Sequence, residues 1–111
     1  MRIAMPLAEG RLCMHFGHCQ AFAFVEVDAE NNIVSVETDT PPPHQPGVLP
    51  QWLGKKSVDL VIAGGMGMRA QEIFRHQGID VVVGAPSQEP EQIATDYLEG
   101  KLRTGANICD H

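Results

Sequence analysis

Two apolar stretches decide the fold class of this chain: DLVIAGG at residues 59–65 and DVVVGAP at residues 80–86. Neither alternates apolar with polar residues, which is typical of parallel strands that are covered on both faces. Between the two stretches, Ala70, Ile73 and Phe74 recur at helical spacing. This pattern predicts a strand–helix–strand unit and therefore an α/β domain.

The remaining patterns add strands and helices around this unit. β-rich or apolar runs predict further strands at residues 2–5, 21–27 and 33–38. Pro6 is expected to stop the first of these strands, and the second is expected to run antiparallel to the first. Short helices are predicted around residues 49–53 and from Pro90 to Gly100. The sequence thus predicts a mixed five-stranded sheet with three helices.

Length and composition limit the classes of function. The chain has 111 residues, of which 43% are hydrophobic, so we expect one domain over residues 1–111. A formal net charge of −6 argues against nucleic acid as a partner, because phosphate binding depends on clustered Lys and Arg. Since neither a membrane-spanning run nor a signal-peptide pattern is visible, we expect a cytoplasmic protein without a membrane partner, as a monomer or homodimer.

Soft metal ligands are concentrated in CMHFGHC at residues 13–19, and the chain ends in a Cys-x-His pair. In a reducing compartment, thiols are more often ligands or nucleophiles than disulfide partners. The candidate metal ligands are Cys13, His15, His18, Cys19, Cys109 and His111. If Cys13 and Cys19 are ligands, we expect partly exposed thiols with lowered pKa values in the metal-free protein.

In the predicted fold, this motif is expected to lie opposite a glycine-rich turn. The loop predicted over residues 7–20 and the turn GGMGMRA at residues 64–70 both follow parallel strands, and ligands of open α/β sheets bind at that edge. The turn opens a helix, whose N–H groups and dipole favour an anion. The candidate cofactor-binding residues are Gly64, Gly65, Gly67, Met68 and Arg69, together with His44 from a proline-rich connector.

Three motifs carry a family resemblance: HFG at residues 15–17, RAQEIFRHQGIDVVVG at 69–84 and YLEGKL at 97–102. In this order and spacing the chain resembles the nitrogenase iron-molybdenum cofactor carrier and biosynthesis proteins over nearly its whole length. The resemblance implies a ribonuclease-H-like fold that binds a preformed metal–sulfur cluster. It does not imply nuclease activity, because the first strand carries no aspartate.

The chain departs from the plainer members of that family by surrounding HFG with Cys13, His18 and Cys19. A thiolate-rich site suits iron–sulfur clusters, zinc and copper as well as a molybdenum-containing cluster. We therefore expect a non-enzymatic carrier or scaffold for a metal–sulfur cluster or a soft metal, with cluster donor and recipient proteins as partners.

Alternatives from other classes follow from the same residues. Gly65, Gly67 and Ala70 match G-x-G-x-x-A, which leaves open a nucleotide- or anion-binding regulatory domain. A structural zinc module is also left open, although a chain with this much core does not need a metal to fold. A phosphatase-like thiol enzyme is excluded, because its C-x5-R loop needs an arginine where Cys19 stands.

Overall fold

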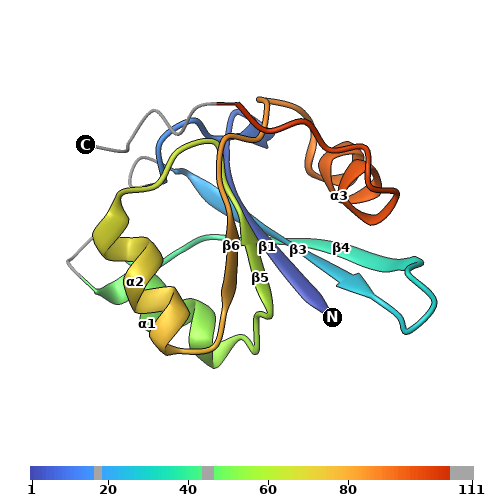
Figure 1. Ribbon diagram of the computed structural model, residues 1–111. Coiled ribbons are helices and arrows are strands. Elements are labelled where there is room, and N and C mark those ends of the chain that lie inside the picture. The colour runs from blue at the N-terminus through green and yellow to red at the C-terminus, as the bar shows by residue number, and fades with distance from the viewer. Residues whose placement is uncertain (17–18, 44–46, 106–111) are drawn as a thin grey trace.

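The structure is a computed structural model that describes residues 1–16, 19–43 and 47–105 (Figure 1). Its elements are β1 (Arg2–Ala8), β2 (Arg11–Leu12), β3 (Ala21–Val27), β4 (Ile33–Asp39), α1 (Val48–Lys55), β5 (Leu60–Ile62), α2 (Met68–His76), β6 (Asp80–Val82) and α3 (Pro90–Leu98). The described ranges thus form a six-stranded mixed sheet with three helices, which confirms the predicted α/β class. The ribonuclease-H-like label stays a prediction.

The sheet has the strand order β4-β3-β1-β5-β6, and the short β2 pairs with β1 beside this path. β5 lies parallel to β1 and to β6, whereas β3 is antiparallel to both β1 and β4. Both predicted directions are therefore confirmed: the strand–helix–strand unit β5–α2–β6 is parallel, and the strand at residues 21–27 opposes the first strand.

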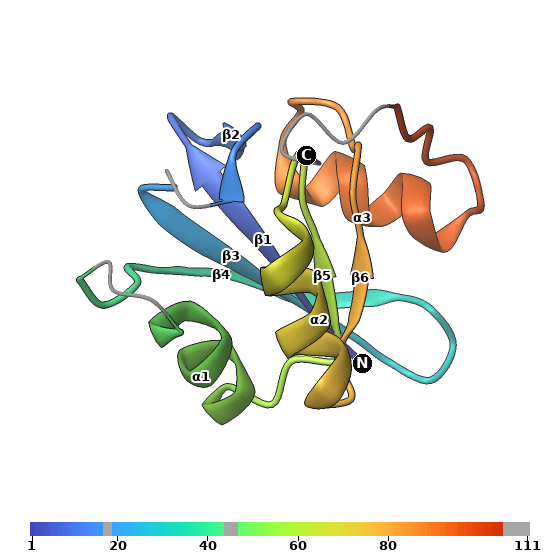
Figure 2. The same cartoon turned by 60° about the vertical axis from the view of Figure 1, so that its left-hand side comes forward.

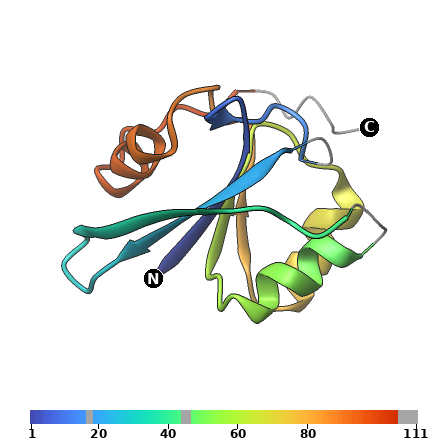
Figure 3. The same cartoon turned by 180° about the vertical axis from the view of Figure 1, so that it is seen from behind.

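Helices cover both faces of the sheet, with α1 and α2 on one side and α3 on the other (Figures 1 and 3). The α3 side buries residues such as Ile3, Val25 and Ile93, each of which is 0% exposed. The other side, where Figure 2 shows α1 and α2 in front of the sheet, buries an aromatic group that includes Phe22 and Phe74. Two filled cores explain why this short chain needs no disulfide.

The expected end of the first strand at Pro6 is wrong, because β1 continues through this proline to Ala8. The carbonyl of Pro6 accepts a hydrogen bond from Cys13 N at 2.8 Å, on the side of β1 that faces β2. The N and the carbonyl of one strand residue point to the same side, so the missing N–H also faces β2. A proline is tolerated at this position because the pairing with β2 does not require a hydrogen bond donated by the main-chain nitrogen of residue 6.

The loop predicted to begin at Leu7 instead opens with a tight hairpin, which adds a sixth strand to the expected five. Leu7 pairs with Leu12 and Ala8 with Arg11, so that two residues make the turn. These are Glu9 and Gly10, with φ of 55° and 80°. Two-residue hairpin turns with positive φ at both positions match the twist of the strands they join. The hairpin returns the chain along β1 and so fixes where Cys13 lies.

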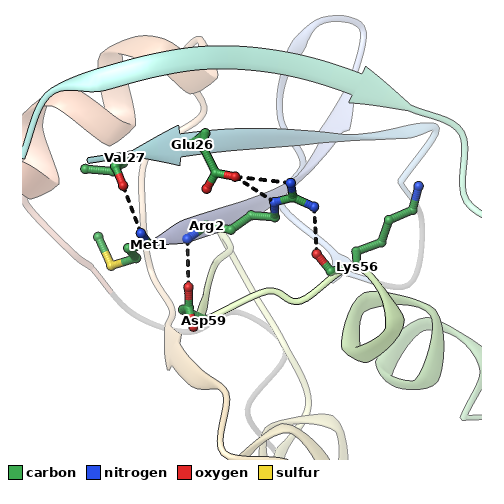
Figure 4. Close-up of polar contacts among 6 residues, drawn as sticks. All are labelled: Met1, Arg2, Glu26, Val27, Lys56 and Asp59. Atoms are coloured by element: carbon green, nitrogen blue, oxygen red, sulfur yellow. Dashed lines mark hydrogen bonds and ion pairs between the residues drawn. The ribbon is translucent and has the colours of Figure 1, made fainter. Parts of the chain in front are cut away.

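A polar network closes the opposite end of β1 (Figure 4). The Arg2 guanidinium donates to Glu26 Oε1 at 3.1 and 3.3 Å and to the Lys56 carbonyl at 2.7 Å. The Arg2 main-chain N–H donates to Asp59 Oδ2 at 2.8 Å. Arg2 therefore connects β1 to β3 and to the end of α1.

Replacing Arg2 with alanine should lower the free energy of unfolding by about 1–2 kcal/mol, because a partly buried carbonyl loses its charged donor. Glu26→Gln is the matched control: it removes only a half-exposed ion pair and should cost less than about 0.5 kcal/mol. Urea unfolding of both variants gives the comparison. Equal losses in the two variants would contradict the role given to the Lys56 carbonyl.

Candidate metal-binding site

The cysteine-bearing loop is held by β1 at both of its ends. Cys13 N donates to the Pro6 carbonyl and Gln20 N to the Leu7 carbonyl, each at 2.8 Å. The Gln20 side chain turns back to accept the N–H of Glu9 at 3.1 Å. Both cysteines therefore leave from fixed points at the carboxyl end of β1.

Phe16 anchors the middle of the loop. It is 7% exposed, and its ring packs edge-on against those of Phe22 and Phe74 with centroids 5.8 and 5.7 Å apart. Its main-chain N–H donates to the Gly65 carbonyl at 2.9 Å. This bond joins the loop after β1 to the turn after β5, which confirms that the two segments face each other.

The turn approaches the loop so closely that a side chain at residue 64 would be crowded. A Cβ on Gly64 would lie 3.0 Å from both the Cys13 carbonyl oxygen and Met14 Cα. The absence of a side chain at Gly64 therefore eases the close packing of the turn against the loop. The sequence indicated neither this contact nor Met14, because close packing between distant segments leaves no local pattern.

The two loop thiols are withdrawn from solvent. Cys13 is 7% exposed and its Sγ donates to the His15 carbonyl at 3.0 Å, while Cys19 is half-buried. Burial, and to a smaller extent the Cys13 sulfur, raise the pKa of the Cys19 thiol to about 11. The Cys13 sulfur therefore lies within electrostatic range of the Cys19 thiol.

The expectation of partly exposed thiols with lowered pKa values is confirmed for the exposure of Cys19 and is wrong for the exposure of Cys13 and for the pKa of Cys19. Cys13 is buried rather than partly exposed, and the pKa of Cys19 moves up rather than down. The physical reason is that the loop packs against the core under α1 and α2, where Cys19 contacts the apolar group around Phe16. There, burial outweighs the lowering effect of a main-chain hydrogen bond.

The remaining predicted ligands are placed as follows. His15 is exposed on the loop. His18, His44, Cys109 and His111 lie outside the described residues. Within residues 1–16, 19–43 and 47–105, no three His, Cys, Asp or Glu side chains are grouped closely enough to hold a metal ion. The described part of the site thus contributes a pair of thiols rather than a complete ligand set.

The glycine-rich turn leads into α2 without a cap. Gly67 is the N-cap residue in an extended conformation, no side chain caps the helix, and its first turn contains no acidic residue. Gln71 holds the turn by donating to the Met66 carbonyl at 2.9 Å. Met68 and Arg69 begin the helix and are exposed. The positive end of α2 is therefore not neutralised by a carboxylate in its own first turn.

These features define a class of protein: a small mixed α/β domain whose strand-end edge carries two thiols beside the N-terminus of a helix. The family model described as Dinitrogenase iron-molybdenum cofactor matches residues 1–100, and the chain belongs to this family. The resemblance inferred from the motifs is thereby confirmed.

Individual relatives agree with this assignment. The chain is 32% identical over 106 residues to the uncharacterized protein MJ0580 of Methanocaldococcus jannaschii, which covers 92% of this chain and 89% of that protein. The crystal structure of PH0822 superposes with a TM-score of 0.88 at 29% identity, over 96% of each chain. The apo form of the orange protein from Desulfovibrio gigas shares the fold, with a TM-score of 0.72 at 23% identity, over 96% of this chain and 93% of that one.

One further property bears on the expected partners. Within the described ranges, each helix is too short or too polar to cross a membrane.

The raised pKa of Cys19 predicts a pH-dependent stability. The unfolded chain loses this proton near pH 9.0, whereas the folded protein keeps it to about 11. The stabilising contribution is therefore complete below pH 9.0 and is lost as the pH rises through about 11. Under reducing conditions, the urea midpoint of the wild type should fall more steeply over this range than that of Cys19→Ser, which lacks the titrating thiol. A constant difference between the two midpoints would contradict the burial of Cys19.

Proposed function

We propose that the loop and the turn together bind an anionic metal–sulfur cluster, of the iron–sulfur or molybdenum-containing type, or a soft metal ion. In this proposal the protein carries its cargo between a donor and a recipient protein and catalyses no reaction. The observation that carries the proposal is that Cys13 and Cys19 stand at the two ends of one loop, which β1 holds at both ends and which Phe16 bonds to the turn that opens α2. Membership of a family described by an iron-molybdenum cofactor supports the cofactor-related part.

The thiols supply the soft ligands. Cysteine thiolates favour iron–sulfur clusters and soft metals over hard cations. Cys13 donates a hydrogen bond through its S–H in the metal-free protein, and Cys19 has a pKa of about 11, so each must release a proton to solvent before it can bind metal. Metal affinity should consequently rise with pH, and reprotonation of Cys19 favours release. A cargo site benefits from such reversibility.

The turn supplies positive charge. Thiolate-bound metal–sulfur clusters carry a net negative charge, and main-chain N–H groups at a helix N-terminus stabilise anions without being titrated. α2 has neither a capping side chain nor an acidic residue in its first turn, and the exposed Arg69 lies in that turn. The helix end beside the loop is thus suited to an anionic cargo.

The packing argues against a purely structural zinc site. The Phe16 ring packs edge-on against those of Phe22 and Phe74 in an apolar core that, among the described residues, contains no His or Cys ligand other than the flanking Cys19. The two sides of the sheet are filled by separate apolar clusters, so a metal is not needed to bury them. A metal held at the rim of such a fold contributes to function rather than to folding.

Anaerobic reconstitution with iron and sulfide, with and without molybdate, tests the proposal. Cys13→Ser and Cys19→Ser should each retain less than about one tenth of the wild-type metal after desalting, because a hydroxyl replaces a soft ligand. Metal and sulfide analysis provides the measurement.

Met14→Leu is the matched control from the same loop, since it conserves volume and keeps both thiols. It should retain wild-type metal. Circular dichroism establishes that each variant is folded. Metal contents equal to the wild type in both serine variants would remove the metal-site interpretation of residues 13–19.

A further inference from the structure

The outer strand β4 leaves one edge of the sheet unpaired. Among the strands of the described residues, β4 pairs with β3 alone and stands at the end of the strand order β4-β3-β1-β5-β6. Six of its seven residues are exposed. Figure 3 shows β4 in front of the other strands, with no helix over it. An uncovered edge of this kind is a template for a further strand.

The register shows which main-chain groups of β4 face outward. Met1 and Val27 exchange two main-chain hydrogen bonds of 2.8 Å, so the polar groups of Val27 face β1. Alternate residues of a strand face opposite neighbours, so Phe24 faces β4 and forms a hydrogen-bonded pair with Glu37. Val36 and Thr38 flank Glu37 and therefore direct their N–H and carbonyl groups away from the sheet.

The side chains of this edge differ between its two faces. Val34 and Val36 are large apolar residues that are 64% and 39% exposed. Val36 lies opposite Val25, which belongs to the core on the α3 side, so the two side chains share that face. Glu37 lies opposite Phe24 on the face that α1 covers in part. The edge thus offers an apolar side chain on one face and a carboxylate on the other.

Positive charge is missing from this part of the chain. Residues 12–54 contain neither Lys nor Arg, and their carboxylates are Glu26, Asp28, Glu30, Glu37 and Asp39. Arg2 pairs with the first of these and Lys56 with the last. Glu37, in the middle of the edge, has no ion pair among the described residues. A second copy of this chain would add like charge at the edge, whereas a basic segment would neutralise it.

We propose that β4 binds an extended segment of a partner protein in which basic residues alternate with apolar ones. The segment adds as an antiparallel strand, and its main chain exchanges hydrogen bonds with Val36 and Thr38. Its apolar side chains extend the face of Val36, and a basic side chain lies opposite Glu37. Because β3 separates β4 from β1 and its cysteine-bearing loop, this inference does not depend on the proposed metal binding.

The synthetic peptide acetyl-KVKVKVK-amide is the probe, since its length matches β4 and its alternation matches the two faces. NMR of the isotope-labelled protein reports the exchange of each amide hydrogen. In the free protein, the Glu37 amide should be protected, whereas those of Val36 and Thr38 should exchange rapidly. Saturating peptide should slow the exchange of the Val36 and Thr38 amides at least about tenfold, because both become hydrogen-bonded.

Two control peptides separate strand addition from attraction between charges. The same peptide N-methylated at its three valines keeps every lysine but loses the donors that face β4, so it should bind at least about tenfold more weakly. Acetyl-EVEVEVE-amide keeps the alternation and reverses the charge. It should leave the exchange of Val36 and Thr38 unchanged, because it places like charges opposite Glu37.

Val36→Pro is the matching change in the protein. It removes an outward N–H and keeps the pairing of Ser35 and Glu37 with β3, a position at which an edge strand tolerates proline. It should weaken peptide binding at least about tenfold, whereas the control Val36→Thr keeps the N–H and should bind within threefold of the wild type. If Val36→Pro does not fold, the exposed Glu37→Lys should weaken binding about tenfold at low salt.

Three results would overturn the inference. The first is a wild type that does not bind acetyl-KVKVKVK-amide. The second is equal binding of the N-methylated peptide, or wild-type affinity in folded Val36→Pro or in Glu37→Lys, because the peptide would then not add as a strand at this edge. The third is self-association that protects the Val36 and Thr38 amides without any peptide, which would assign the edge to a second copy of the chain.

Discussion

The contact between the loop after β1 and the turn after β5 is the constraint on which the site depends. A hydrogen bond from Phe16 N to the Gly65 carbonyl, edge-on packing of the Phe16 ring, and the absence of a Cβ at Gly64 bring the two segments together. They come from separate strands of one parallel pair, so their meeting follows from the topology of the sheet. Without this contact, the two thiols would have no fixed relation to α2.

The same contact determines the chemistry of the thiols. It holds the loop against the aromatic core under α1 and α2, which buries Cys13 and raises the pKa of Cys19 to about 11. A redox or nucleophilic cysteine requires an accessible thiolate near neutral pH, and the raised pKa of Cys19 disfavours one at that residue. Reversible metal ligation is compatible with a protonated resting state, because the metal itself drives the proton off. A protonated resting state is therefore compatible with the proposed carrier role.

The sequence predicted the larger part of the architecture because most strands and helices have local sequence patterns. Apolar runs without alternation identified β5 and β6, and β-rich runs identified the antiparallel pair β3 and β4. The prediction failed at Pro6, since a proline is excluded from a strand only where its N–H is needed, and the partner of that position was not visible in the sequence. The two-residue β2 was missed because so short a strand leaves no periodic pattern.

The sequence predicted which residue types make up the candidate site, but it did not predict their burial, their pKa values or their contacts. The motif at residues 13–19 and the glycine-rich turn were identified, and their juxtaposition followed from the strand order. The burial of Cys13, the raised pKa of Cys19 and the close approach of Gly84 to Gly105 depend on contacts between distant segments. Such contacts are fixed by packing, and a single sequence does not display them.

Whether Cys13 and Cys19 ligate the same metal is the central claim, and X-ray absorption at the metal edge tests it most directly. With zinc as the probe, sulfur ligands at about 2.3 Å are distinguished from nitrogen or oxygen ligands at about 2.0–2.1 Å. We predict that both sulfurs lie in the first coordination sphere of the zinc in the anaerobically loaded wild type. Cys13→Ser and Cys19→Ser should each lose one sulfur ligand. Unchanged sulfur coordination in both variants, at equal metal content, would contradict it.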